Sequence, residues 1–144
     1  MYEDMLGRVE IFNSLDKKEL ETLGRECRER SYSAGTTIIK QGDSGSGLFI
    51  ITSGHVKVTI AHHPDRAEEE VGTFGPGSVL GEMALLDDQP RSASIVTIED
   101  VTALILPVWE FRATMRSHPD IAIKLLSVMS RRLRRLERKN DQLA

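Results

Sequence analysis

Residues 74–93 have the sequence FGPGSVLGEMALLDDQPRSA, and the prediction of the fold starts from this stretch. Gly75, Pro76 and Gly77 are typical of a tight turn, and Gly81 lets the backbone approach a bound molecule closely. The five residues that follow are strong helix formers, but a turn-forming run comes next and leaves room for about one helical turn. We therefore predict a loop that contains a single helical turn.

The chemistry of this loop predicts an anion site. Backbone N–H groups at the start of the turn are available to an anion. Arg91 follows at the start of the next predicted strand, and a guanidinium matches two phosphate oxygens with two parallel hydrogen bonds. Glu82 would repel a phosphate, so we expect its carboxylate to accept a hydrogen bond from a sugar hydroxyl, as in other nucleotide sites. The predicted ligand has one anionic phosphate and a neighbouring free hydroxyl.

Short β-branched segments separated by glycines surround the loop and predict a β-roll or barrel. The predicted strands are residues 36–39, 48–51, 56–60, 71–74, 92–98 and 101–106. Residues 65–70, with the sequence DRAEEE, are predicted to form the exposed tip of a hairpin.

Helical periodicity is present before and after the strands. Asp16 followed by Glu19 matches a capping box and predicts a helix from about Asp16 to about Arg30. A short helix is predicted from Pro107 to near His118.

A longer helix is predicted from Pro119 to about Asn140. Its apolar positions form one continuous stripe: Ile121, Leu125, Met129, Leu133 and Leu136. The stripe continues past the expected edge of the roll, which favours a partner helix and a homodimer, while core packing within the chain is the alternative.

Composition excludes several classes of protein. The chain has 144 residues, a net charge of −3 and one cysteine. Without a basic excess we expect no direct binding of nucleic acid, and the basic run at residues 131–139 is interpreted as a solvated helix face. A single thiol favours a reducing cytoplasm. No apolar run is long enough for membrane insertion, and the four histidines lack metal-ligand spacing, so no metal or other cofactor is expected.

The loop resembles the phosphate-binding cassette of cyclic nucleotide-binding domains, in which a Gly-Glu-apolar-small-apolar turn precedes Pro-Arg-Ser/Thr-Ala. The matching segments are GEMAL at 81–85 and PRSA at 90–93, and we place the cassette at 75–93. The similarity extends from about Val9 to about Leu136.

This resemblance implies an α+β fold: a β-roll or jelly roll of about eight antiparallel strands, flanked by an N-terminal helix and by C-terminal hinge and lid helices. We predict one domain over residues 1–144, with an N-terminal helical segment at about 1–30, the roll at 31–106 and helices at 107–144. The implied function is a regulatory sensor without a catalytic site, which binds cyclic AMP and relays occupancy through its C-terminal helix.

The resemblance also assigns roles to single residues. Arg91 is expected to bind the exocyclic phosphate oxygens, Glu82 the ribose 2′-hydroxyl, and Ser92 the phosphate or the base. The full set of predicted ligand-binding residues is Gly81, Glu82, Met83, Ala84, Arg91, Ser92, Arg132 and Leu136. Within it, the amides of Met83 and Ala84 support the phosphate, Arg132 approaches Glu82, and Leu136 covers the purine.

The base is less well specified than the phosphate. In related bacterial activators a pair of hydroxyls on the lid helix contacts adenine, whereas Leu136 and Glu137 occupy those positions here. Cyclic GMP therefore remains the alternative ligand. Two other functions remain open: a cupin-like, metal-dependent β-roll enzyme, and a ligand-free β-roll that serves as a dimerisation module.

Overall fold

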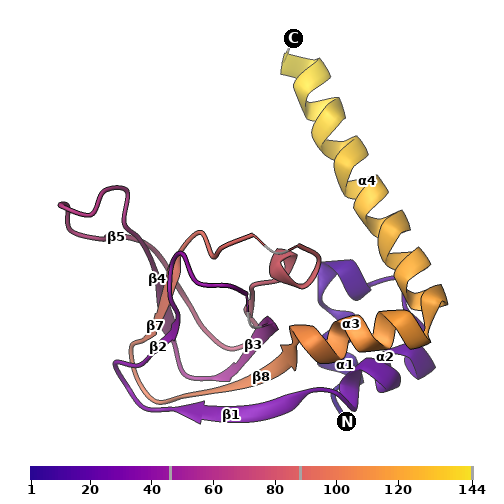
Figure 1. Ribbon diagram of the computed structural model, residues 1–144, viewed down its shortest axis with the longest axis horizontal. Helices are drawn as coiled ribbons and strands as arrows, with labels where there is room; N and C mark the ends of the chain where they lie inside the picture. Colours follow the sequence, from indigo (N-terminus) through magenta and orange to yellow (C-terminus); the bar gives the residue numbers. More distant parts are fainter. Residues whose placement is uncertain (46, 88, 144) are drawn as a thin grey trace. The chain divides into compact units, whose positions relative to one another are not determined.

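The computed structural model describes residues 1–45, 47–87 and 89–143. Ser46, Ala144 and Asp88 of the predicted cassette lie outside the described residues. The chain divides into two compact units (Figure 1). Residues Glu26–Phe111 form the β unit, and Met1–Arg25 with Arg112–Ala144 form the helical unit. Each unit is described by itself.

Within the described part of the β unit, eight strands form two antiparallel sheets in the orders β1-β8-β3-β6 and β2-β7-β4-β5. The strands are β1 (Arg28–Tyr32), β2 (Thr37–Ile39), β3 (Gly47–Ser53), β4 (Val56–Ile60), β5 (Glu69–Phe74), β6 (Val79–Leu80), β7 (Ser94–Thr97) and β8 (Val101–Pro107). These strands confirm the prediction of an α+β fold with about eight antiparallel strands. Of the predicted hairpin tip, residues 65–68 lie between β4 and β5 and residues 69–70 begin β5, and all six are exposed.

The core of the β unit consists of apolar side chains from both sheets, because every second residue of a strand points to the same side. They form one buried cluster: Ile39, Phe49, Ile51, Val56, Ile95, Val101, Ala103 and Ile105. All eight residues belong to the segments whose β-branched composition predicted strands.

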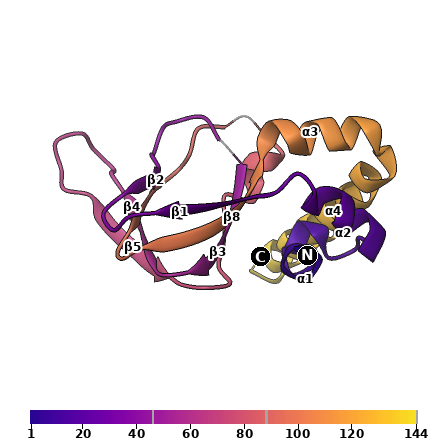
Figure 2. The same cartoon turned by 90° about the horizontal axis from the view of Figure 1, so that it is seen from below.

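Two strands differ from the prediction. The helix predicted to reach Arg30 ends at Gly24, and Arg28 begins β1 instead. The sequence of β1 is polar and mostly exposed, so it carries no alternating apolar signal. Its conformation is set by five antiparallel pairs with β8, which lies beside it in both views of the ribbon (Figures 1 and 2). The second missed strand, β6, has only two residues, too few for a recognisable pattern.

The described helices are α1 (Glu3–Gly7), η1 (Glu10–Phe12), α2 (Lys17–Gly24), the short turn η2 (Met83–Leu85), α3 (Val108–Ser117) and α4 (Pro119–Leu143). Of these, α3 crosses the division between the units. The predicted capping box of α2 is confirmed. The Glu19 N–H donates to Asp16 Oδ1 at 2.8 Å, and the Asp16 N–H donates to Glu19 Oε1 at 3.0 Å. Among the described residues, no helix combines the length and apolarity that a bilayer span requires.

The apolar stripe predicted along α4 is buried only over the first part of the helix. Ile121 and Leu125 are buried, whereas Leu133 and Leu136 are exposed. At about 100° per residue, Leu136 lies within about 20° of Leu125 around the helix axis, so rotation of the stripe does not explain its exposure. Residues 133–140 are all exposed, so in the described part of the chain the second part of the helix is left uncovered.

Candidate functional site

A cavity of about 390 Å³ lies in the β unit against the predicted cassette, within the size range of small-molecule sites. Its lining residues are Gly81, Glu82, Met83, Ala84, Asp87, Gln89, Pro90, Arg91 and Ser92. Six of the eight predicted ligand-binding residues therefore surround one cavity. The other two, Arg132 and Leu136, belong to α4 in the helical unit.

Arg91 lies in the loop before β7, not at the start of a strand as predicted. Its backbone is fixed on both sides, because its N–H donates to the Asp43 carbonyl at 2.9 Å and its carbonyl accepts from the Gly42 N–H at 2.8 Å. The side chain is only 8% exposed. One guanidinium nitrogen, Nη2, donates to the carbonyl of Gly47 at 2.7 Å.

The remaining donors of this guanidinium are poorly satisfied. The Nε atom is buried and has no hydrogen-bond partner in the described part of the chain. No described carboxylate forms an ion pair with Arg91, and burial lowers the pKa of its guanidinium. An arginine still stays protonated in proteins. A buried cation without a counter-charge is costly, so this site favours an anion over a neutral molecule.

The guanidinium lies in a slot that glycines leave open. A Cβ at Gly81 would lie 2.3 Å from Arg91 Nη1, and a Cβ at Gly45 would lie 2.9 Å from the Ala84 side chain. Gly81 also has a φ of +78°, which other residues rarely adopt. Gly81 is thus required twice, for its backbone conformation and for the space that Arg91 occupies.

The single helical turn predicted after Gly81 is a 3₁₀ turn, η2 (Met83–Leu85). One of the two amides predicted to face the phosphate is used within this turn. The Ala84 N–H, which was expected to be free for the phosphate, donates to the Gly81 carbonyl at 3.2 Å. A three-residue spacing closes this bond within the turn, whereas an α-helical turn would have left the amide open.

Arg132 has a partner that the sequence did not predict. Its Nη2 lies 2.9 Å from Glu10 Oε2, and its Nε donates to Glu10 Oε1 at 3.2 Å, so the two side chains form a fork. The hydrogen bonds from Arg132 and then Arg135 lower the pKa of the Glu10 carboxyl. With Leu136 and Lys139, these residues line a second cavity of about 410 Å³ within the helical unit.

Sequence reasoning missed Gly45 and Gly47 as parts of the site. The Gly45–Gly47 segment is too short for a phosphate-binding loop of its own, and its role depends on a side chain 44 residues away. The available signal was the density of glycines immediately before a β-branched strand. Among the described residues, no three His, Cys, Asp or Glu side chains are grouped in a way that could hold a metal ion.

The sequence of this chain is similar to those of known cyclic nucleotide-binding proteins. The sequence profile of the cyclic nucleotide-binding domain matches residues 29–118. The chain is 32% identical over 142 residues to the CRP-like cAMP-activated global transcriptional regulator of Mycobacterium tuberculosis, covering 99% of this chain and 62% of that protein. It is 34% identical over 134 residues to the cyclic AMP receptor protein of Thermus thermophilus, covering 93% of this chain and 62% of that protein. The chain thus spans about three fifths of the length of these relatives.

Solved structures show the same fold. The N-terminal domain of a transcriptional regulator from Streptomyces coelicolor A3(2) superposes with a TM-score of 0.83 at 30% identity, covering 98% of this chain and 96% of that one. The regulatory domain of Toxoplasma gondii PKA, crystallised with cAMP, gives a TM-score of 0.71 at 27% identity, covering 88% of this chain and 49% of that one.

Proposed function

This chain belongs to the cyclic nucleotide-binding domain family, and on that premise we propose that it is a regulatory module that binds cyclic AMP in the cavity at residues 81–92. The observation that carries the proposal is the state of Arg91. Its guanidinium is buried, is unpaired at Nε and lies at the edge of a cavity of suitable size. A cyclic phosphate carries one negative charge and two exocyclic oxygens, which match the fork of a guanidinium.

The other cassette residues supply the ribose half of the site. Glu82 borders the same cavity as Arg91 and accepts a hydrogen bond from the ribose 2′-hydroxyl. Ser92 lies next to Arg91 on the lining and donates to the phosphate or contacts the base. No nucleophile or proton transfer is needed, so the proposed activity is binding without catalysis.

We assign the base contact to α4. Leu136 is an exposed apolar residue suited to cover the purine, and Arg132, which pairs with Glu10 in this structure, is the candidate to approach Glu82 when the ligand is bound. Because Leu136 offers no hydrogen bond, it does not distinguish adenine from guanine. Cyclic AMP is preferred in the proposal because the named relatives respond to it, and cyclic GMP is the ligand to compare.

The connection from the site to the helices passes through Gly47. Arg91 donates to the Gly47 carbonyl, and Gly47 is paired with Pro107, the last residue of β8. Val108 then begins α3. A phosphate that draws the guanidinium toward the cavity therefore acts on the strand pair directly before this helix. The relay requires that the ligand bind one helix position more tightly than the other.

A second copy of the chain is the proposed partner of α4. Leu126 and Leu133 are seven residues apart, and both are exposed. Met129 and Leu136 are also seven residues apart; Met129 is partly buried and Leu136 is exposed. Two apolar positions repeated at seven residues are typical of a coiled-coil seam. Sedimentation velocity tests this point: we expect a dimer for the unaltered chain and a monomer for Leu133→Lys. A monomeric unaltered chain would rule out the homodimer.

The main test is calorimetric titration with cyclic AMP. We expect Arg91→Ala to weaken binding by at least tenfold, since a hydrogen bond to a charged group contributes about 1.5–3 kcal/mol. Arg66→Ala removes the same charge from the exposed hairpin tip and should bind like the unaltered chain. Arg91→Lys keeps the charge without the fork and should fall between them. No binding by the unaltered chain, or equal binding by Arg91→Ala when it is folded, would refute the proposal.

A further inference from the structure

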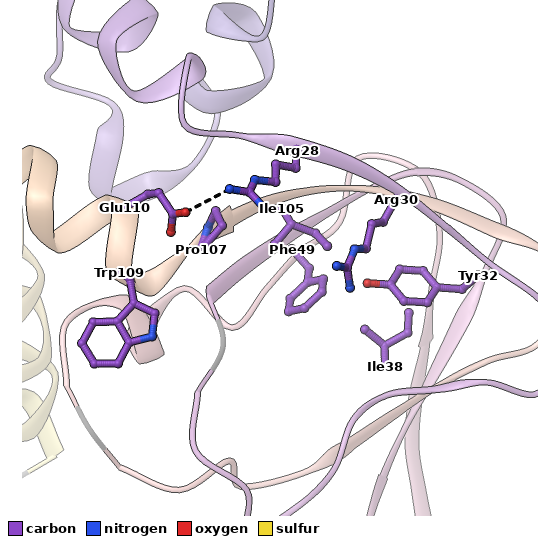
Figure 3. Close-up of a pocket in the computed structure, with 9 residues that line it drawn as sticks. All are labelled: Arg28, Arg30, Tyr32, Ile38, Phe49, Ile105, Pro107, Trp109 and Glu110. Atoms are coloured by element: carbon purple, nitrogen blue, oxygen red, sulfur yellow. Dashed lines mark hydrogen bonds and ion pairs between the residues drawn. The ribbon is translucent and has the colours of Figure 1, made fainter.

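A second cavity of the β unit, about 400 Å³ in volume, lies between β1, β8 and the start of α3 (Figure 3). Its lining residues are Arg28, Arg30, Tyr32, Ile38, Phe49, Ile105, Pro107, Trp109 and Glu110. Of the described residues, none lines both this cavity and the cassette cavity. The site is therefore separate from the proposed nucleotide site.

The floor of this cavity is the core of the roll. Phe49 and Ile105 are buried, and they are paired directly across β3 and β8. Arg28 is paired with Ile105 on the other side, so the three residues form one row across the sheet. The row brings two core side chains to the cavity lining at a point where the edge strand contributes a cation.

The arginines of β1 lie on the side of the sheet that carries the core residues Phe49 and Ile105. Arg28, Arg30 and Tyr32 alternate along the strand, so they share the face on which Phe49 lies. Figure 3 shows the Arg30 guanidinium between Phe49 and the Tyr32 phenol, turned into the cavity. Two positive charges thus stand above an apolar floor.

Among the described residues, only one of these charges is balanced by an ion pair. Arg28 Nη2 lies 3.2 Å from Glu110 Oε1, which fixes the Arg28 side chain along one wall. In the described part of the chain, Arg30 forms no ion pair or side-chain hydrogen bond. The lining therefore carries one excess positive charge in a protein whose net charge is −3. Trp109, 73% exposed, adds an indole at the rim.

We propose that this cavity binds small organic anions with an apolar body and a single carboxylate. The body packs on Phe49 and Ile105 beside the Trp109 indole, and the carboxylate pairs with Arg30. A cavity with apolar walls and one convergent charged group is the usual form of a site for such a ligand. A charge-assisted pair with a guanidinium fixes the orientation of the carboxylate.

Trp109 is the only tryptophan of the chain, so its fluorescence reports on this cavity directly. Titration of the full chain with octanoate should give a saturable change in emission. Octanol has the same apolar body without a charge, and octylamine has it with a positive charge. Both should bind more weakly than octanoate. Calorimetry with octanoate should return the same dissociation constant as fluorescence.

The decisive variant is Arg30→Met, which keeps an apolar stem and removes the charge. We expect it to weaken octanoate binding by about tenfold, the effect of one lost hydrogen bond to a charged group, and to leave octanol binding unchanged. Arg30→Lys should restore most of the affinity. Arg66→Met makes the same change outside the cavity and should have no effect.

Three outcomes would overturn the proposal: no saturable binding of octanoate, equal binding of octanoate and octylamine, or an unchanged affinity in Arg30→Met. The arginines would then serve only to keep an edge strand from pairing with another chain. A parallel titration with cyclic AMP separates this inference from the proposed function, because Arg30→Met should leave nucleotide binding unchanged.

Discussion

Gly81→Ala would place a methyl group where the guanidinium of Arg91 lies. The added Cβ would be 2.3 Å from Arg91 Nη1 and 2.9 Å from the Gly47 carbonyl oxygen. The carbonyl is backbone and cannot move freely, so the arginine is the group that must leave. The substitution also places an alanine at a φ of +78°, which costs about 1–2 kcal/mol of folding free energy.

The two effects can be separated with Gly35→Ala. Gly35 has a φ of +79°, nearly the same as Gly81, but no neighbouring heavy atom lies within 4 Å of an added Cβ. Both variants should therefore lose about 1–2 kcal/mol in urea unfolding from the backbone alone. Only Gly81→Ala should lose the guanidinium contact to the phosphate. At about 1.5–3 kcal/mol per charged hydrogen bond, its affinity for cyclic AMP should fall roughly ten- to hundredfold.

Calorimetric titration of the two variants and the unaltered chain measures the difference. Gly35→Ala should bind within about twofold of the unaltered chain, at a temperature where all three are folded. Equal affinities for Gly81→Ala and Gly35→Ala would show that the guanidinium does not need this slot. The assignment of Arg91 as the phosphate ligand would then be wrong.

Three further predictions concern single groups. Glu82→Ala should weaken cyclic AMP at least tenfold but leave 2′-deoxy cyclic AMP unchanged, because the carboxylate acts on the 2′-hydroxyl; an equal loss for both ligands would contradict this role. Cys27, whose pKa is raised to about 12 by burial and then by Glu26, should react with a thiol reagent at pH 8 only after unfolding, whereas rapid reaction of the native chain would contradict it. In the folded chain, the hydrogen bond from Arg132 lowers the pKa of the Glu10 carboxyl. The stability that the ionised Glu10 contributes is therefore fully present above the ordinary carboxyl pKa and is lost as the pH falls through the lowered pKa. Urea unfolding of Glu10→Gln should therefore depend less on pH in this acidic range, and an unchanged dependence would count against the pair.

Local signals in the sequence were sufficient for elements that depend on nearby residues. The capping box of α2 joins two side chains three residues apart, and its predicted hydrogen bonds are present. The strands β3, β4 and β8 are β-branched and bounded by turn residues, so their composition alone predicted them. The cassette was recognisable because its residues are close together in the chain.

Features that depend on distant residues could not be predicted in this way. The strand β1 has a polar sequence, and only its pairing with β8, about 70 residues later, makes it a strand. The division of α4 into a packed first part and an exposed second part depends on where its neighbours in the helical unit end. In both cases the local pattern allowed two structures, and packing selected one.

The cassette at residues 75–93 was recognisable from the sequence alone, since a glycine-rich turn, a carboxylate and an arginine in that order predict a phosphate and ribose site. The tertiary structure decided how the arginine is held. Only folding brings the Gly47 carbonyl to 2.7 Å from Arg91 and buries the guanidinium with an unpaired Nε. The physical reason is that desolvation and the resulting need for an anion depend on atoms that are far apart in the chain, and no sequence window contains them.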